Sequence, residues 1–316
     1  MLRKKALRKI FTTTLTLFIL LTVYLIPKTQ DKVLLRTNME IKNNFNDGTN
    51  SIYLLNKDGY LVKTKVFLKE TDLKEQVEEL LNILTTKSEK ITSSLRPIIP
   101  ENTKVLEISI SNNELILNFS KEFLNIKKDL STQLISSIVY TLTDLNSMYR
   151  IKIFVEGNKL DTYPNLDIPL KDSLDKSIGI NKTYNISSRD NIEKVVVFYN
   201  EKIDNNIYYV PVTKYLNDSR SKIEIIVDEL SSSYIYEPNL MSFLNNNIKL
   251  LNYEEKENVM FLNFNDYLFN NNKEILEEVA YTISYSVFAN YDVNMVCLEV
   301  NDKQIKQINI GDIPKK

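Results

Sequence analysis

The sequence repeats one order of elements at two places, about 145 residues apart. Residues 105–119 contain two alternating apolar runs around Asn112-Asn113, and residues 248–264 contain the same pair around a polar turn. Both pairs end in the same Leu-Asn-Phe. A repeat of this length indicates a domain duplication, because solenoid units recur about every 20–50 residues. The chain is therefore expected to fold as two similar domains.

The elements that follow this hairpin-like pair also recur. An apolar stripe at helical spacing predicts helices at Leu130–Leu145 and Ile275–Ala289, with Ser131 as the N-cap of the first. A closing strand is then predicted at Arg150–Val155 and at Val293–Val300.

Two strands and a helix are predicted to open each copy. In the first copy the strands are Ile52–Leu55 and Leu61–Leu68, and a helix capped by Thr71 or Asp72 runs to about Leu84. In the second copy the order is the same. Its strands are predicted at Val195–Tyr199 and Ile207–Val212, and a helix capped by Asp218 or Ser219 runs to about Leu230.

Alternation of strands and helices predicts a mixed α/β (α+β) fold for each copy, with two helices packed on one face of a small sheet. The hairpins require antiparallel pairing, and no Gly-rich turn joins a strand to a helix. A purely parallel dinucleotide-binding sheet is therefore not expected.

The N-terminus has the charge pattern of a membrane segment. Five positive charges lie in residues 1–9, and residues 10–26 form an uncharged, mostly apolar run just long enough to cross a bilayer. No small-residue cleavage site follows the run, so an uncleaved signal anchor is favoured over a cleaved signal peptide or a buried core helix. Basic residues stay in the cytoplasm, which would place the rest of the chain outside it.

Changes in composition, together with Gly, Pro and Asn residues typical of turns and loops, divide the chain into six parts. They are a cytoplasmic basic tail (1–9), a transmembrane signal anchor (10–26), a linker (27–50), a first domain (51–160), a connection (161–192) and a second domain (193–310).

Composition also excludes several functions. The chain has no His, which removes the commonest general base and metal ligand, and excludes a Ser-His-Asp triad. Its net charge is −1, and the five N-terminal cations leave the remainder at −6. An acidic body does not favour nucleic-acid binding. The only cysteine, Cys297, lies between apolar residues of a predicted strand and is expected in the core.

Acidic side chains form no catalytic or metal-binding pattern. Glu78-Glu79 and Asp228-Glu229 are adjacent on predicted helices, where neighbours point about 100° apart. Acids in the turn at residues 254–257 are expected to face solvent, and Ser173 and Lys176 match a Ser-Lys spacing only by chance. We therefore predict no catalytic, cofactor-binding or metal-binding residues, although sequence does not exclude two carboxylates that converge in a cleft.

Aromatic residues recur at helical spacing near the C-terminus, at Tyr281, Tyr285, Phe288 and Tyr291. Packing in a core or an interface is the favoured interpretation, and a platform for stacking glycans is the alternative.

Five segments of the first copy carry a family signature. They are Val77–Leu81, Leu95–Leu106, Leu115–Phe123, Tyr140–Leu145 and Val155–Gly157. Their order resembles the GerMN domain of sporulation and spore-germination proteins. The second copy matches at Leu262–Phe264 and Tyr281–Ile283. The resemblance implies a fold similar to the ring-building motif, and self-association in the space between two membranes. This chain departs from the family at Thr85-Thr86, where Gly-Pro is usual, and lacks a lipobox cysteine.

These observations predict a non-enzymatic, membrane-anchored extracytoplasmic protein of sporulation or germination. It would act through other membrane or sporulation proteins, or through copies of itself, without nucleic acid or cofactor. The alternatives are a module that binds the peptidoglycan cell wall and, less favoured, a wall hydrolase that uses carboxylates.

Overall fold

The structure is a computed structural model that describes residues 49–89, 91–147, 149–232 and 239–312. These residues belong to one compact unit, residues 44–316. The predicted basic tail, anchor and most of the linker, residues 1–48, lie outside the described residues. Within the described part of the chain, no helix combines the length and the apolar character needed to cross a bilayer.

Each copy contains a four-stranded outer sheet of the same topology. The first outer sheet consists of β3 (Val105–Ser111), β4 (Glu114–Phe119), β5 (Arg150–Val155) and β6 (Asn158–Lys159). The second consists of β10 (Leu250–Lys256), β11 (Val259–Phe264), β12 (Met295–Val300) and β13 (Lys303–Asn309). In both sheets the middle pair is parallel and the outer pairs are antiparallel. This confirms two repeated α+β domains.

The two outer sheets also agree in register. Strands β10, β11 and β12 begin at residues 250, 259 and 295, each 145 residues after β3, β4 and β5 at 105, 114 and 150. Even the bulge between Val105 and Glu107 recurs between Leu250 and Asn252. The duplication therefore preserves backbone detail as well as element order.

The asparagine of each Leu-Asn-Phe motif stabilises a turn through its side-chain oxygen. The side-chain oxygen of Asn118 accepts a hydrogen bond from the backbone N–H of Gly157 at 3.0 Å, and Asn263 accepts one from Asp302 at 3.0 Å. Both acceptors hold the turn that reverses the chain after the closing strand. The two residues after the closing strand have a positive φ in each copy. They are Glu156 and Gly157 after β5, and Asn301 and Asp302 after β12. An asparagine at this position thus fixes a strained turn against the neighbouring strand.

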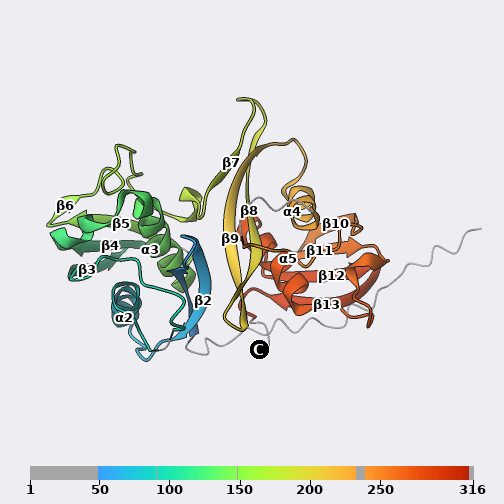
Figure 1. Ribbon diagram of the computed structural model, residues 1–316, viewed down its shortest axis with the longest axis horizontal. Helices are drawn as coiled ribbons and strands as arrows, with labels where there is room; N and C mark the ends of the chain where they lie inside the picture. The colour runs from blue at the N-terminus through green and yellow to red at the C-terminus, as the bar shows by residue number, and fades with distance from the viewer. Residues whose placement is uncertain (1–48, 90, 148, 233–238, 313–316) are drawn as a thin grey trace, which may run out of the picture. The chain divides into compact units, whose positions relative to one another are not determined.

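The opening strands of each copy form a separate hairpin. The first hairpin is β1 (Thr49–Leu55) with β2 (Leu61–Phe67), and the second is β8 (Ile192–Ile203) with β9 (Asn206–Asn217). The hairpins meet where β2 pairs antiparallel with β9, at Lys63 and Tyr209, and form the central sheet. The sequence predicted these strands but not that the two copies share them in one sheet (Figure 1).

Two side chains join the copies beside this strand pairing. The side chain of Asn181 bonds the main chain of Leu61 on β2 and of Pro211 on β9, at 2.8–2.9 Å. Nearby, the amide of Asn56 donates to both carboxylate oxygens of buried Glu201, at 2.9 and 2.8 Å. Burial raises the pKa of Glu201. The amide donors partly compensate the loss of water around this carboxylate.

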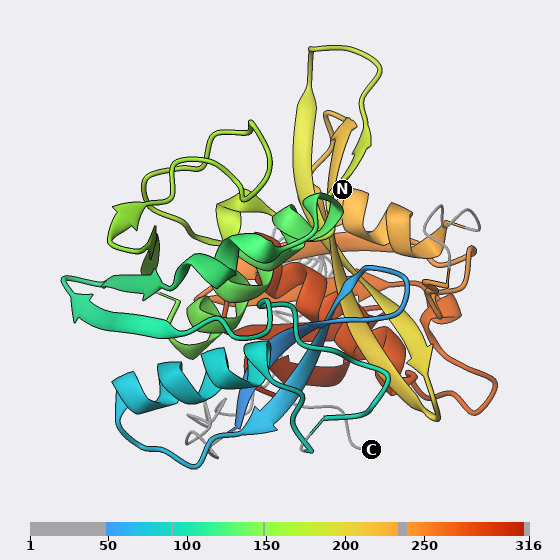
Figure 2. The same ribbon diagram turned by 60° about the vertical axis from the view of Figure 1, so that its left-hand side comes forward.

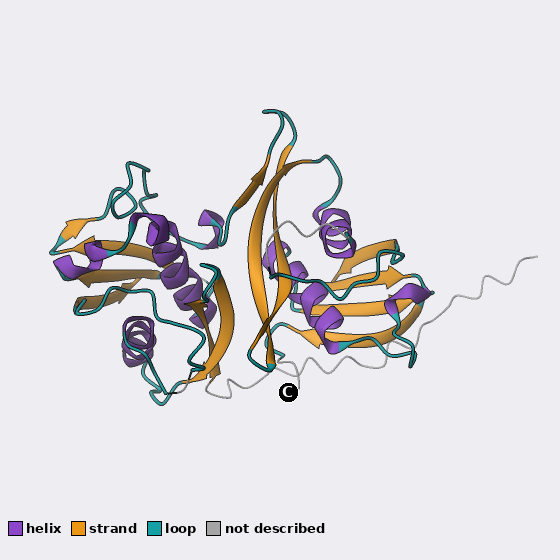
Figure 3. Ribbon diagram, viewed as in Figure 1, coloured by secondary structure: helices purple, strands orange, loops and turns teal. Residues whose placement is uncertain are grey.

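The helices fill the space between the hairpins and the outer sheets (Figure 3). The first copy has α2 (Leu73–Thr85) and α3 (Ser131–Leu145), and the second has α4 (Lys222–Ser231) and α5 (Glu277–Asn290). Helices α3 and α5 are buried on nearly every side, including their Ser and Thr positions. An all-round buried pattern is expected of a helix covered on both faces.

Small polar side chains bind each long helix to the first strand of its hairpin. The hydroxyl of Ser137 donates to the carbonyl of Tyr53 at 2.6 Å, and Thr141 accepts from the N–H of Tyr53 at 3.2 Å. In the second copy Ser286 accepts from the N–H of Phe198 at 2.8 Å. Ser286 lies 145 residues after Thr141, so it is the structural counterpart of that residue. Tyr281–Ile283 therefore lies one helical turn before the counterpart of Tyr140–Leu142.

Three predicted helix starts can be checked against the caps. Asp72 caps α2 as predicted, accepting from the N–H groups of Lys74 and Glu75. Neither Asp218 nor Ser219 caps α4, because Ser221 and Glu224 form a reciprocal capping box there. Ser131 is the first residue of α3 and not its cap, since a short 3-10 turn leads directly into that helix.

The connection between the copies is also structured. It contributes β7 (Thr183–Asn185), which pairs in parallel with the end of β9 and extends the central sheet. The segment that joins β7 to β8 projects away from the outer sheets in two views (Figures 1 and 2).

We predict that Asn263→Ala lowers the free energy of unfolding by about 1–2 kcal/mol, because the turn after β12 loses an acceptor and a donor. That corresponds to a melting temperature lower by about 2–8 °C for a domain of this size. Calorimetry of the full chain measures it. Asn252→Ala on the exposed face of β10 is the matched control, and an equal shift in both variants would contradict the assignment.

Candidate functional site

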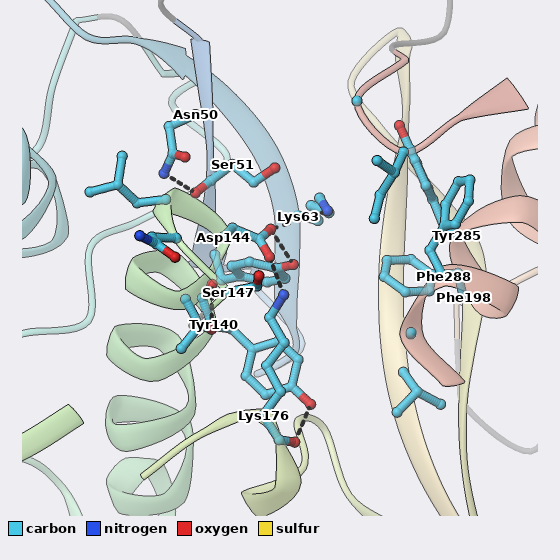
Figure 4. A pocket seen from close by; sticks show the side chains of 18 of the residues that line it. Asn50, Ser51, Lys63, Tyr140, Asp144, Ser147, Lys176, Phe198, Tyr285 and Phe288 are labelled. Carbon is cyan, nitrogen blue, oxygen red and sulfur yellow. Dashed lines mark hydrogen bonds and ion pairs between the residues drawn. The ribbon is translucent and has the colours of Figure 1, made fainter. Parts of the chain in front are cut away.

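A cavity lies between the two copies, over the central sheet. It has a volume of about 1040 Å³, and the C-terminal ends of α3 and α5 flank it (Figure 4). Residues from β1, β2 and β8 complete it, together with Lys176, Lys222 and the segment Ile310–Asp312. We call this cavity the interdomain cleft. Its volume lies at the upper end of the range of about 300–1,000 Å³ that is usual for ligand sites.

One wall of the cleft is built around Asp144 at the end of α3. Its carboxylate forms ion pairs with Lys63, at 3.2 Å, and with Lys176, and it accepts a hydrogen bond from the hydroxyl of Tyr53 at 2.9 Å. The side chain of Asp144 is 11% exposed. Two ammonium groups thus share one carboxylate, which leaves an excess of positive charge.

Burial opposes the ionisation of Asp144, but the charges of Lys176 and Lys63 hold the pKa of its carboxyl well below its ordinary value. A carboxylate that stays ionised at neutral pH does not donate a proton, so this geometry does not favour a general acid. The same cluster raises the pKa of Tyr53, through burial and then the charge of Asp144.

The opposite wall is aromatic. Phe198 on β8 and Tyr285 and Phe288 on α5 face the charged cluster (Figure 4). Phe198 and Tyr285 pack together with ring centroids 5.5 Å apart. The ammonium of Lys63 reaches across to the Tyr285 ring, 5.3 Å from its centroid. A cation over an aromatic face is stabilised by about 0.5–2 kcal/mol, so Lys63 links the two walls.

Further lysines lie around the rim. Lys194 donates to the carbonyl of Ser177 at 2.7 Å, and Lys222 lies 3.5 Å from the carboxylate of Glu193. Lys65 donates to the carbonyl of Gly311 at 3.2 Å, which connects the first copy to the end of the second. Burial, then the nearby charge of Lys171, lowers the pKa of Lys194. The rim therefore concentrates positive charge in a partly dehydrated place.

The acids considered in the sequence do not converge. Glu79 accepts from the N–H of Lys69, while Asp228 pairs with Arg220 and Glu229 pairs with Lys214. The acids at residues 254–257 lie exposed on β10 and its turn. Among the described residues, no group of three or more Cys, Asp or Glu side chains has the arrangement of a metal site.

The remaining candidate residues from the sequence make contacts within the protein that support its fold. Cys297 is buried, with its sulfur 3.9 Å from that of Met295. Tyr281 is buried and Tyr285 is half-buried, and both rings contact Tyr209 on β9. Burial raises the pKa of Tyr281 to about 12. Tyr281 and Tyr285 thus pack beside the junction of the two copies. Tyr291 lies within the second copy, where its hydroxyl accepts from the N–H of Ile223 on α4 at 3.1 Å. Lys176 pairs with Asp144 and not with Ser173.

Sequence reasoning missed the charged cluster of the cleft. Lys63, Asp144 and Lys176 come from three distant segments, and only the fold brings them together. One signal was present, because Asp144 belongs to the Tyr140–Leu145 segment of the family signature.

Two tandem α+β domains of one topology, joined through a shared sheet, define the class of this protein. The family model described as "Germane: Sporulation and spore germination" matches residues 51–161 and 195–306, which is most of the chain. The chain belongs to this family, the one that contains the GerMN domain.

Two relatives support this assignment. The chain is 28% identical over 260 residues to the spore germination protein GerM of Bacillus subtilis (strain 168), covering 80% of this chain and 71% of that protein. It is also similar to the solved tandem GerMN domains of the sporulation protein GerM from Bacillus subtilis. That similarity has a TM-score of 0.74 and 26% identity, and covers 83% of this chain and 96% of the other.

We predict that Asp144→Asn destabilises the chain by roughly 3 kcal/mol, because Lys63 and Lys176 lose their counter-charge. The pKa of Asp144 is depressed in the folded state, so its contribution is present above the unfolded pKa of about 3.9 and is lost at lower pH. The stability difference between wild type and variant should therefore shrink as pH falls from about 5 to 2.

Chemical denaturation at a series of pH values measures this. Asp129→Asn, on an exposed residue before α3, is the matched control. A stability difference that does not change with pH would contradict the prediction.

Proposed function

We propose that this chain is a non-enzymatic, membrane-anchored protein of sporulation or spore germination that acts outside the cytoplasm. It binds other proteins or copies of itself. The observation that carries the proposal is the match of both copies to the Germane family, in the tandem arrangement also found in GerM. The charged N-terminus and the apolar run at residues 10–26 support the anchor.

Exposed sheet edges support association. Among the described residues, strands β3 and β10 each pair with one strand, so each forms an edge of its outer sheet. Strand β10 carries two exposed apolar side chains, Leu251 (50% exposed) and Tyr253 (42% exposed). An open edge with apolar side chains is suited to pairing with a strand of another chain.

The cell-wall alternative has one observation in its favour. Tyr184 on β7 is 66% exposed, and its ring stacks on Tyr215 with centroids 5.0 Å apart. Tyr281 and Tyr285 on α5 support it less, because their rings pack against one another and against Tyr209. Protein association therefore remains the favoured function.

The anchor predicts that the full chain stays with the membrane pellet after alkaline carbonate extraction in a sporulating host. Deletion of residues 2–26 should move the chain to the soluble fraction, since the body has no other long apolar run. Immunoblotting of both fractions measures the distribution. Retention of the deletion variant in the pellet would refute anchoring by this segment.

If the edge of β10 is the contact surface, the double variant Leu251→Lys, Tyr253→Lys should reduce self-association or partner capture at least about tenfold. The reason is that lysine on a sheet edge disfavours the addition of another strand. Crosslinking in cells followed by mass analysis measures both kinds of complex. Ile168→Lys, at an equally exposed loop residue, should leave them unchanged. A wild-type chain that forms no complex would overturn the proposed function.

A further inference from the structure

The charge of the interdomain cleft is opposite to that of the body. Five lysines and two aspartates line it, and no glutamate or arginine does. The lining therefore carries three positive charges in excess, or two when Glu193, the ion-pair partner of Lys222, is included. The chain without its first nine residues has a net charge of −6. A concentration of cations attracts anions, and the acidic remainder of the protein repels them, so an anionic ligand is directed to the cleft.

The fold does not require these charges. The second copy offers a direct comparison, because the same backbone positions are occupied by different side chains. The counterparts of Tyr53 and Asp144, 145 residues later, are Phe198 and Ala289. Lys63 lies opposite Tyr53 in the first hairpin, and Pro211 lies opposite Phe198 in the second. Pro211 is therefore the counterpart of Lys63. The second copy builds the same scaffold with no hydroxyl, carboxylate or ammonium at these positions.

The positive charge in the cleft exceeds what would balance the partial negative charge at the C-termini of the two long helices. Helices α3 and α5 both end at the cleft, and neither has a basic residue in its last turn. Each C-terminus carries a partial charge of about −0.5, so together they offset about one of the two excess charges that remain once Glu193 is included. A net positive potential therefore remains in the cleft.

The other lining groups indicate the kind of anion. Side chains that donate and accept hydrogen bonds lie among the lysines, such as those of Ser51 and Ser147. They suit a ligand with its own peptide groups to satisfy. The cavity is far larger than a single ion needs, so the ligand is an extended one.

A glycan fits the cleft less well than a peptide. Sugars stack on open ring faces, but the rings of Tyr53, Tyr140 and Phe198 are buried. The ring of Tyr285 is occupied by Phe198 and Tyr209. Apolar side chains of a peptide can instead contact Tyr285 and Phe288, which are partly exposed.

We propose that the interdomain cleft binds an extended acidic segment of a partner protein, whose carboxylates pair with Lys176, Lys194 and Lys222. The inference rests on the proposed function, since it gives the chemistry of a partner. Lys194 is the strongest candidate contact, because no carboxylate lies within ion-pair distance of it among the described residues. Lys63 stays with Asp144 and the aromatic wall and positions the site.

The test uses the full chain in mild detergent and a fluorescent ten-residue peptide of alternating Glu and Ala. Anisotropy should show saturable binding that weakens as salt rises, because the contacts are ionic. The same peptide with Gln in place of Glu should not bind. Lys194→Gln and Lys176→Gln should each weaken binding roughly tenfold, the effect expected for loss of a hydrogen bond to a charged group.

Three controls make the result specific. Lys256→Gln, on exposed β10, should leave the affinity unchanged. Lys194→Arg should retain most of the binding, because the charge is kept. Melting temperatures identify any variant that fails to fold, and Lys194 at the rim provides a test that does not disturb Asp144.

Several outcomes would overturn the proposal. They are equal binding of the Glu and Gln peptides, equal affinities of the Lys194→Gln, Lys176→Gln and Lys256→Gln variants, or binding of peptidoglycan fragments in the cleft without binding of the acidic peptide. If crosslinked complexes persist in cells under any of these outcomes, the proposed function stands and the cleft inference alone fails.

Discussion

The hydrogen bonds between each long helix and the opening strand of its hairpin determine the rest of the architecture. Ser137 and Thr141 occupy the outer edge of β1, and Ser286 occupies that of β8. With those edges covered, β2 and β9 are the edges left for the two copies to share. Their pairing creates the central sheet, places the ends of α3 and α5 opposite one another, and leaves the cleft between them.

Much of this fold could be predicted from periodicity, because the signals were local. Strand β5 was predicted to the residue, and α3 and α5 to within one or two residues. The errors arise where a partner distant in sequence decides. Strands β8 and β9 extend beyond their apolar runs, since pairing with one another holds polar residues such as Glu193 in the ladder. The cap of α4 was misplaced because Ser221 has Glu224 to complete its box, which Asp218 lacks.

The site was harder to predict than the fold for the same reason. The α5 aromatics were expected to pack, and they do, yet helical spacing alone does not reveal that they face a charged wall. Lysines at positions 63, 176, 194 and 222 look like ordinary solvated residues when considered separately. The more useful sequence signal is the difference between the copies. Where the scaffold is duplicated, a charge present in one copy and absent from the other is not required by the shared scaffold, although its removal from a charged cluster such as that of Asp144 still lowers stability.

The shared central sheet has a consequence for the order in which the molecule forms. A ribosome releases the first hairpin, its helices and its outer sheet about 60 residues before β9 is complete, and synthesis adds about 5–20 residues per second. During those seconds the edge of β2 lies open on an otherwise finished domain, ready to pair with any neighbouring strand. Lysine side chains on an exposed edge disfavour pairing with strands of other chains. Lys63 and Lys65 on β2 therefore oppose such pairing until the second copy has been synthesised.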